Sequence, residues 1–186
     1  WLERLCVVTL ILLLLNFLFA SITSLNEKIT AYLFISAAAV QFARWLRWKP
    51  WITLAVPLLW SLHIAMAFIW WGLLTLGLAY LAPDVPNNHV WHILTIGGMS
   101  GLILAMITRV SLGHTGRMLS PPKPMIVDYI AIFVSAIARS FGPWVSPDLG
   151  LAFYDASIAF WLVAYGLFSV YYGPMLLKPR TDGRPG

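Results

Sequence analysis

Six long apolar stretches constrain this chain more than any other feature of its sequence. A helix that crosses the hydrocarbon core of a bilayer needs about 20 mostly apolar residues. Six segments meet that length, at about residues 5–22, 29–46, 52–81, 89–110, 125–144 and 151–177. An open sheet cannot satisfy its backbone hydrogen bonds in lipid. The sequence therefore predicts an all-α membrane protein, with residues 1–186 forming a single bundle of six transmembrane helices joined by short loops.

The composition agrees with a lipid environment and excludes several classes of soluble protein. Charged residues make up 10% of the chain, whereas soluble domains carry about 25%, so the lipid bilayer is the expected partner. The net charge of +5 accompanies no nucleic-acid-binding motif, and no nucleic-acid partner is expected. The single cysteine, Cys6, excludes an intrachain disulfide. No nucleophile triad or paired-carboxylate site is evident, so the sequence supports no enzyme class.

Two of the predicted spans are irregular. The third is longer than a bilayer requires, and Pro57 is expected either to kink it or to leave its ends protruding. Asp128 and Arg139 interrupt the fifth span, which is the least regular of the six.

The basic residues predict the orientation of the bundle. Ten of the twelve lysines and arginines fall on one side of the six predicted spans: Arg4, Arg44, Arg47, Lys49, Arg109, Arg117, Lys123, Lys178, Arg180 and Arg184. Lys and Arg accumulate in cytoplasmic loops. The pattern therefore predicts a multi-pass protein of a plasma membrane with both termini in the cytoplasm.

Charged residues within spans are rare and usually face partners or water. At about 1.5 Å per helical residue, Arg139 and Asp155 lie at similar depth near the outer side, and Arg109 and Asp128 share the inner side. We favour two interhelical ion pairs that fix the packing of the helices. Two alternatives are that an arginine neutralises an anionic group, such as a porphyrin propionate, or that an aspartate relays protons.

Three histidines are candidate metal ligands. His63 is expected about 16 Å inside the third span, where it is either a packed, hydrogen-bonded residue or a ligand. His89 and His92 share a helix face and could bind a metal, although polar residues at a helix N-terminus explain them more simply. His114 is expected in a tight loop, where neighbouring amides and Arg117 could also hold an anion.

Spacing limits how these groups combine. His92 and His114 are 22 residues apart in one span, so they cannot ligate the same metal while the helix stays straight. No two histidines lie at matching depth, and a partner ligand is expected from outside this chain. Methionines near the histidines suit Cu(I) but are more simply explained by packing. Gly97 and Gly101 form a small-xxx-small pattern that predicts close helix contact.

The segment "HILTIGGMSGLILAMITRVSLGHTGR", residues 92–117, resembles the signature of the NnrS family of bacterial integral membrane proteins. The preceding "PLLWSLHIAMAFIWWGLL" resembles the histidine-bearing, aromatic-rich helix of the same family. The resemblance is best over residues 50–145. It implies haem and copper as cofactors, a bacterial inner membrane, and a role in the response to nitric oxide or protection from it, with nitric oxide as a ligand.

On this resemblance the candidate metal ligands are His63, His92 and His114, and Arg109 and Arg117 are candidates to neutralise a propionate. Members of the family contain more than six transmembrane helices, and this chain begins with Trp1 rather than Met. We therefore expect a C-terminal half, completed by an N-terminal half or by a second subunit. The competing hypothesis is half of a multi-pass transporter or channel, with intramembrane Asp and Arg residues lining a pathway.

Overall fold

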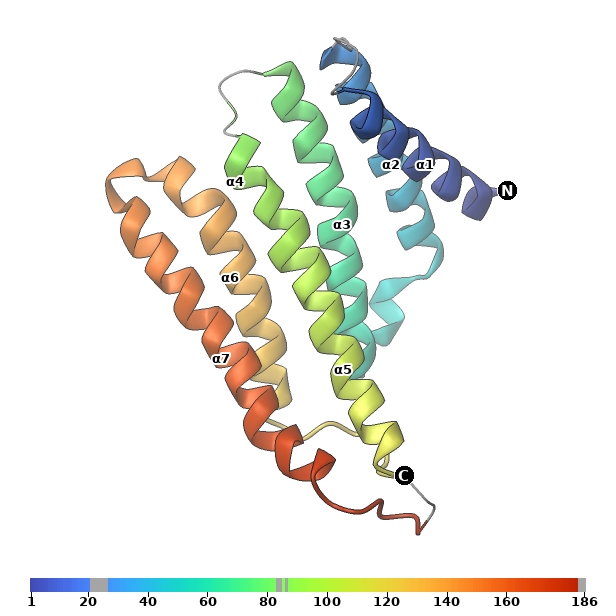
Figure 1. Ribbon diagram of the computed structural model, residues 1–186, viewed down its shortest axis with the longest axis vertical. Helices are drawn as coiled ribbons and strands as arrows, with labels where there is room; N and C mark the ends of the chain where they lie inside the picture. Colours follow the sequence, from blue (N-terminus) through green and yellow to red (C-terminus); the bar gives the residue numbers. More distant parts are fainter. Residues whose placement is uncertain (21–26, 83–84, 86, 184–186) are drawn as a thin grey trace.

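The computed structural model describes residues 1–20, 27–82, 85 and 87–183 as a bundle of helices (Figure 1). Its α-helices are α1 (Leu2–Ala20), α2 (Glu27–Arg47), α3 (Pro57–Leu81), α4 (Asn87–His92), α5 (Gly101–His114), α6 (Met125–Val145) and α7 (Gly150–Leu176). Two short 3-10 helices, η1 (Pro50–Thr53) and η3 (Pro147–Leu149), precede α3 and α7, and a π-helix, η2 (Ile93–Ser100), joins α4 to α5. Within the described residues, six helical segments are long and apolar enough to cross a membrane. The predicted fold class is confirmed.

Neighbours in sequence are neighbours in space. α1 and α2 lie at one edge of the bundle, α6 and α7 at the other, and α3 and the α4–η2–α5 helix lie between them (Figure 1). The connections from α2 to α3 and from α5 to α6 lie at the same end of the bundle as the C-terminal segment (Figure 1). We call this the basic end, because most of the lysines and arginines flank these connections, and the opposite end the outer end.

Glycines bring α3 and η2 into close contact. A Cβ on Gly97 would overlap the Phe68 ring, and one on Gly72 would lie 2.6 Å from Leu94 Cγ. A Cβ on Gly101 would lie 2.8 Å from Phe133 Cε1 on α6. Small residues let helix backbones approach where lipid gives no hydrophobic drive for association. The close contact predicted from the glycine pattern is confirmed.

The π-helix η2 was not predicted from the sequence. Its eight residues form i→i−5 turns, and the Ser100 hydroxyl donates to the Thr95 carbonyl oxygen at 3.1 Å. From α7, the Tyr165 hydroxyl donates to the Ser100 carbonyl oxygen, also at 3.1 Å. Hydropathy is the same for α- and π-helices, so it gave no signal for this widened segment, which is rare and often lies at functional sites.

Two predicted helix ends were wrong, and both errors move a histidine. Pro57 begins α3 instead of kinking it, because proline fits the first turn of a helix, where its missing N–H costs nothing. His63 therefore lies six residues, or about 9 Å, from the start of its helix instead of the expected 16 Å. His114 ends α5 in its last turn and does not lie in a loop.

The packing of Gly97 makes a testable prediction. Gly97→Ala should destabilise the protein by about 1–3 kcal/mol, because the added methyl group forces Phe68 out of place. Gly166→Ala on α7 is the matched control, since a Cβ there meets nothing within 4 Å. The control should leave stability unchanged or raise it slightly. Thermal unfolding in detergent measures both, and equal midpoints for the two variants would contradict the predicted contact.

Candidate functional site

A cavity of about 620 Å³ lies at the surface between η2, α6 and α7. It is lined by Ile96, Ser135, Arg139, Tyr154, Ser157, Ile158, Trp161 and Leu162. Its walls are mostly apolar, with one cation and a few hydroxyl groups. Pockets that bind small molecules and cofactors have this character and fall within about 300–1,000 Å³.

Arg139 is held at this cavity by an aromatic ring. Its guanidinium carbon lies 4.1 Å from the centroid of the Tyr154 ring, within the range of a cation–π interaction. The ring of His89 also stacks on Tyr154, with centroids 6.1 Å apart and planes at 13°. The His92 imidazole lies within electrostatic reach of both Arg139 and His89. The outer end therefore gathers two imidazoles, a guanidinium and a phenol beside the cavity.

The ion pairs predicted within the spans are not seen where the structure describes the chain. Salt bridges within 4.0 Å there join Arg44 to Glu3 and Arg180 to Asp182. Asp155 is exposed on α7, and its neighbour Tyr154 takes the place expected for it against Arg139. Arg139 therefore meets the turn of α7 that its predicted depth indicated, but its partner there is an aromatic ring and not a carboxylate.

His63 lies in a separate, smaller cavity of about 220 Å³ near the basic end, walled by Trp45, Trp51 and Trp60. The Trp45 indole N–H donates to the carbonyl oxygen of His63 at 2.8 Å, which ties α2 to α3. The imidazole itself lies 6.1 Å from the Trp48 ring, measured between centroids. This pocket is apolar and below the size range of most cofactor pockets.

His114 is exposed and shares a surface groove of about 340 Å³ with Met106 and Arg109. Arg109 follows His92 by 17 residues in one continuous helix, a separation of about 25 Å. Arg109 and Arg117 therefore belong with His114 at the basic end and lie far from His92. The three histidines occupy three different places, and no group of three His, Cys, Asp or Glu able to hold a metal occurs among the described residues.

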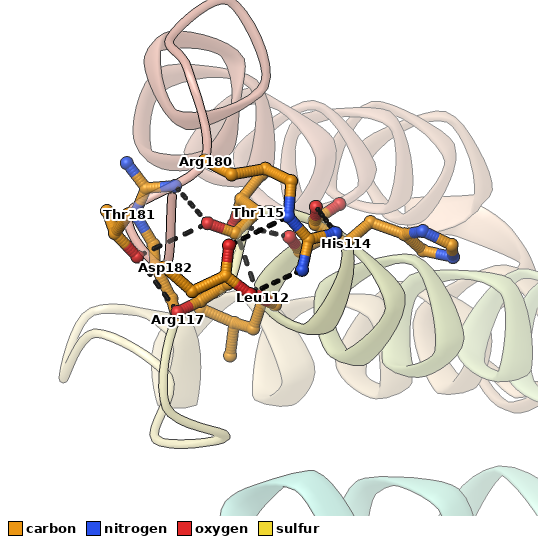
Figure 2. Close-up of polar contacts among 9 residues, drawn as sticks. Leu112, His114, Thr115, Arg117, Arg180, Thr181 and Asp182 are labelled. Atoms are coloured by element: carbon orange, nitrogen blue, oxygen red, sulfur yellow. Dashed lines mark hydrogen bonds and ion pairs between the residues drawn. The ribbon is translucent and has the colours of Figure 1, made fainter. Parts of the chain in front are cut away.

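The turn after α5 binds the C-terminal segment (Figure 2). Arg180 donates through Nη1 to the His114 carbonyl oxygen at 2.9 Å, and the Thr181 hydroxyl donates to the Gly116 carbonyl oxygen at 2.8 Å. The Thr181 amide donates to the Thr115 carbonyl oxygen at 3.1 Å. These bonds satisfy carbonyl groups that the end of a helix leaves without partners. We call residues 180–182 the strap.

Within the strap, Arg180 and Asp182 form a two-pronged ion pair, with Nε–Oδ1 and Nη2–Oδ2 distances of 2.9 and 2.6 Å. The hydrogen bonds to Asp182 raise the pKa of Arg180, so the guanidinium stays charged. The amides of residues 115, 116 and 117 donate to carbonyl oxygens of residues 111, 113 and 112. Since these amides are already bonded, they are not free to form the anion nest that the sequence suggested.

A cluster of buried polar side chains lies between α5, α6 and α7 near the basic end. The hydroxyl groups of Thr108 and Tyr129 lie 2.7 Å apart in a hydrogen bond. Asp128 and Tyr172 are fully buried beside them. Arg109, the predicted partner of Asp128, instead lines the surface groove with His114. Tyr172 was missed from the sequence because it is one of four tyrosines on α7 and no local pattern distinguishes it from the others.

The geometry defines a multi-pass helical membrane protein with histidine–arginine groupings at both ends of one central helix. The family model described as NnrS protein matches residues 1–180, and the chain belongs to the NnrS family. The match extends well beyond residues 50–145, which carried the resemblance. No curated protein and no solved structure gives a significant match.

The strap makes a prediction at Gly116, which has φ of +71° and whose Cβ would lie 2.7 Å from Asp182 Cγ. Gly116→Ala should release the strap at a cost of about 1–3 kcal/mol, because it adds a backbone strain and a clash. Hydrogen exchange of the Thr181 amide, measured on the whole chain in detergent, should become about tenfold faster or more. Gly183→Ala is the matched control, with φ of +70° and no atom near its Cβ. Protection of Thr181 that survives in Gly116→Ala would refute the docking.

Proposed function

We propose that this NnrS-family chain is a haem-binding membrane protein of the nitric oxide response, with its haem site at the outer end. The observation that carries this proposal is the 620 Å³ cavity with Arg139 on its wall and His89 and His92 beside it. His92 would hold the haem iron, because it is the one predicted ligand within electrostatic reach of Arg139 on the cavity wall.

The residues present at this cavity fit a haem. Imidazole is a common axial ligand of haem iron, and a guanidinium matches a carboxylate in a two-pronged hydrogen bond. The apolar side chains Ile96, Ile158 and Leu162 would cover a porphyrin face and exclude water. When bound, ferrous haem supplies an iron that takes nitric oxide as a ligand. Arg139, held on Tyr154, would fix the orientation by binding a propionate.

Copper is the second cofactor in this proposal, and it has less support. His114 and Met106 line one groove, and imidazole with thioether suits Cu(I). Two such side chains leave an incomplete ligand set, and the described residues contain no cluster that would complete it. A copper ion here would take a further ligand from another part of a longer protein or from a second subunit.

A visible spectrum tests the haem proposal. The whole chain, purified in detergent with haem supplied, should show a Soret band that His92→Ala removes or shifts. Arg139→Gln should weaken haem retention by about tenfold, because the loss of a charge-assisted hydrogen bond costs roughly 1.5–3 kcal/mol. His114→Ala and Arg109→Gln repeat the same chemistry at the basic end and should leave the band unchanged.

Two outcomes would count against this assignment. A band lost in His114→Ala but kept in His92→Ala would move the site to the basic end. A colourless wild type, free of metal by elemental analysis, would remove the haem proposal and favour the transporter hypothesis.

We further propose a bacterial inner membrane location with the basic end and both termini in the cytoplasm, following the distribution of Lys and Arg. Met118→Cys at the basic end and Leu149→Cys at the outer end are both exposed positions. A membrane-impermeant maleimide on intact cells should label Leu149→Cys and spare Met118→Cys. Both should label after lysis, and the parent chain gives the background, since Cys6 is buried. The reverse pattern would invert the topology.

A further inference from the structure

Among the acidic and basic side chains of the described residues, Asp128 is the most completely buried. It lies in the first turn of α6 and is 0% exposed. Tyr172 of α7, also 0% exposed, lies within electrostatic reach of it. The adjacent Tyr129 bonds to Thr108 of α5, and the Trp60 ring of α3 meets the Tyr129 ring edge-on. Asp128 is thus buried next to Tyr172 and adjacent in sequence to a tyrosine that contacts two further helices.

The hydrogen bonds of this group are incomplete. In the described part of the chain, no group lies in good hydrogen-bonding geometry to either carboxyl oxygen of Asp128 or to the hydroxyl of Tyr172, although the Tyr129 amide lies near the carboxyl group. An ionised carboxylate can only accept hydrogen bonds, so two buried oxygens without donors are the costliest arrangement for that form. The carboxylic acid has an O–H donor and no charge, and it removes most of that cost.

Among the described residues, no cation offsets the charge that an ionised Asp128 would carry. The titratable groups within reach are Tyr129 on α6 and Tyr172 on α7, and both are phenols. Arg109 is adjacent to Thr108 in sequence, but its side chain lines the surface groove with His114. Within the described residues, no lysine or arginine lies within 4.0 Å of the Asp128 carboxyl group.

We propose that Asp128 is a proton-binding site inside the bundle, with the Tyr172 hydroxyl as the group that exchanges hydrogen bonds with it. The ligand is a proton, held on a carboxyl oxygen, where it removes the charge of the carboxylate and supplies an O–H donor. Asp128 precedes Arg139 by 11 residues, or about 16 Å along α6. The site is therefore separate from the haem cavity, and it does not depend on the proposed function.

Infrared difference spectroscopy of the whole chain in lipid nanodiscs tests this proposal. The spectrum of the wild type minus that of Asp128→Asn, at neutral pH, should contain the carbonyl stretch of a protonated carboxylic acid. Tyr172→Phe should keep that band and shift its frequency, because the acid loses a hydroxyl neighbour. Asp155→Asn, which changes an exposed aspartate on α7, is the matched control and should leave the band unchanged.

Stability gives a second measurement that does not depend on the spectrum. Asparagine is nearly isosteric with the neutral acid, so Asp128→Asn should change the thermal midpoint little. A carboxylate band with no acid band would overturn the proposal, as would a carboxylate that appears only when sodium is present. A large loss of stability in Asp128→Asn would also overturn it, because it would indicate an ionised Asp128 bound to a cation.

Discussion

Lipid offers no hydrogen bonds to a polypeptide backbone, and this constraint underlies the whole structure. Each apolar stretch must satisfy its amides internally and becomes a helix. The same constraint places the polar side chains, since each must find a partner within the protein or lie near an end of the bundle. Arg139 meets the Tyr154 ring near the outer end, and the Ser135 hydroxyl donates to the Ser157 carbonyl oxygen at 2.8 Å between α6 and α7. Several buried polar side chains of the described chain depart from this rule, and Asp128 is the carboxylic acid among them.

Helix association follows from the same solvent. Lipid tails are as apolar as leucine, so shape rather than hydrophobicity must hold these helices together. Glycines supply the shape, because Gly97 receives the Phe68 ring and Gly101 packs against Phe133. The π-helix that contains Gly97 widens the central helix between the two groups of histidine and arginine. It therefore affects how side chains on α4 are oriented relative to those on α5. η2 also contributes Ile96 to the wall of the 620 Å³ cavity.

The sequence predicted the features that depend on composition along one helix. Apolar length predicted six spans, and the glycine pattern predicted a close contact. The sequence did not predict features that depend on which side chains of different helices face each other. The depth of His63 was wrong because Pro57 starts a helix as readily as it kinks one. The strap joins residues about 65 positions apart, such as Thr181 and Gly116, and no local pattern encodes that pairing. Hydropathy describes one segment at a time, whereas the contacts at the cavity and at the strap each join two or more segments.

In the family signature at the end of α5, the backbone binds the strap and the side chain of His114 does not. The carbonyl groups of His114, Thr115 and Gly116 accept hydrogen bonds from the strap, and Gly116 leaves room for Asp182. The acceptors are backbone carbonyl groups, so these bonds do not depend on the side chains of residues 114 and 115. Gly116 differs, because its positive φ and its contact with Asp182 require a glycine. The side chain of His114, by contrast, is exposed beside Arg109 and takes no part in those bonds. The imidazole of His114 is therefore not needed for the strap, and it is available to the copper site proposed for this groove. The residues that follow it hold the strap.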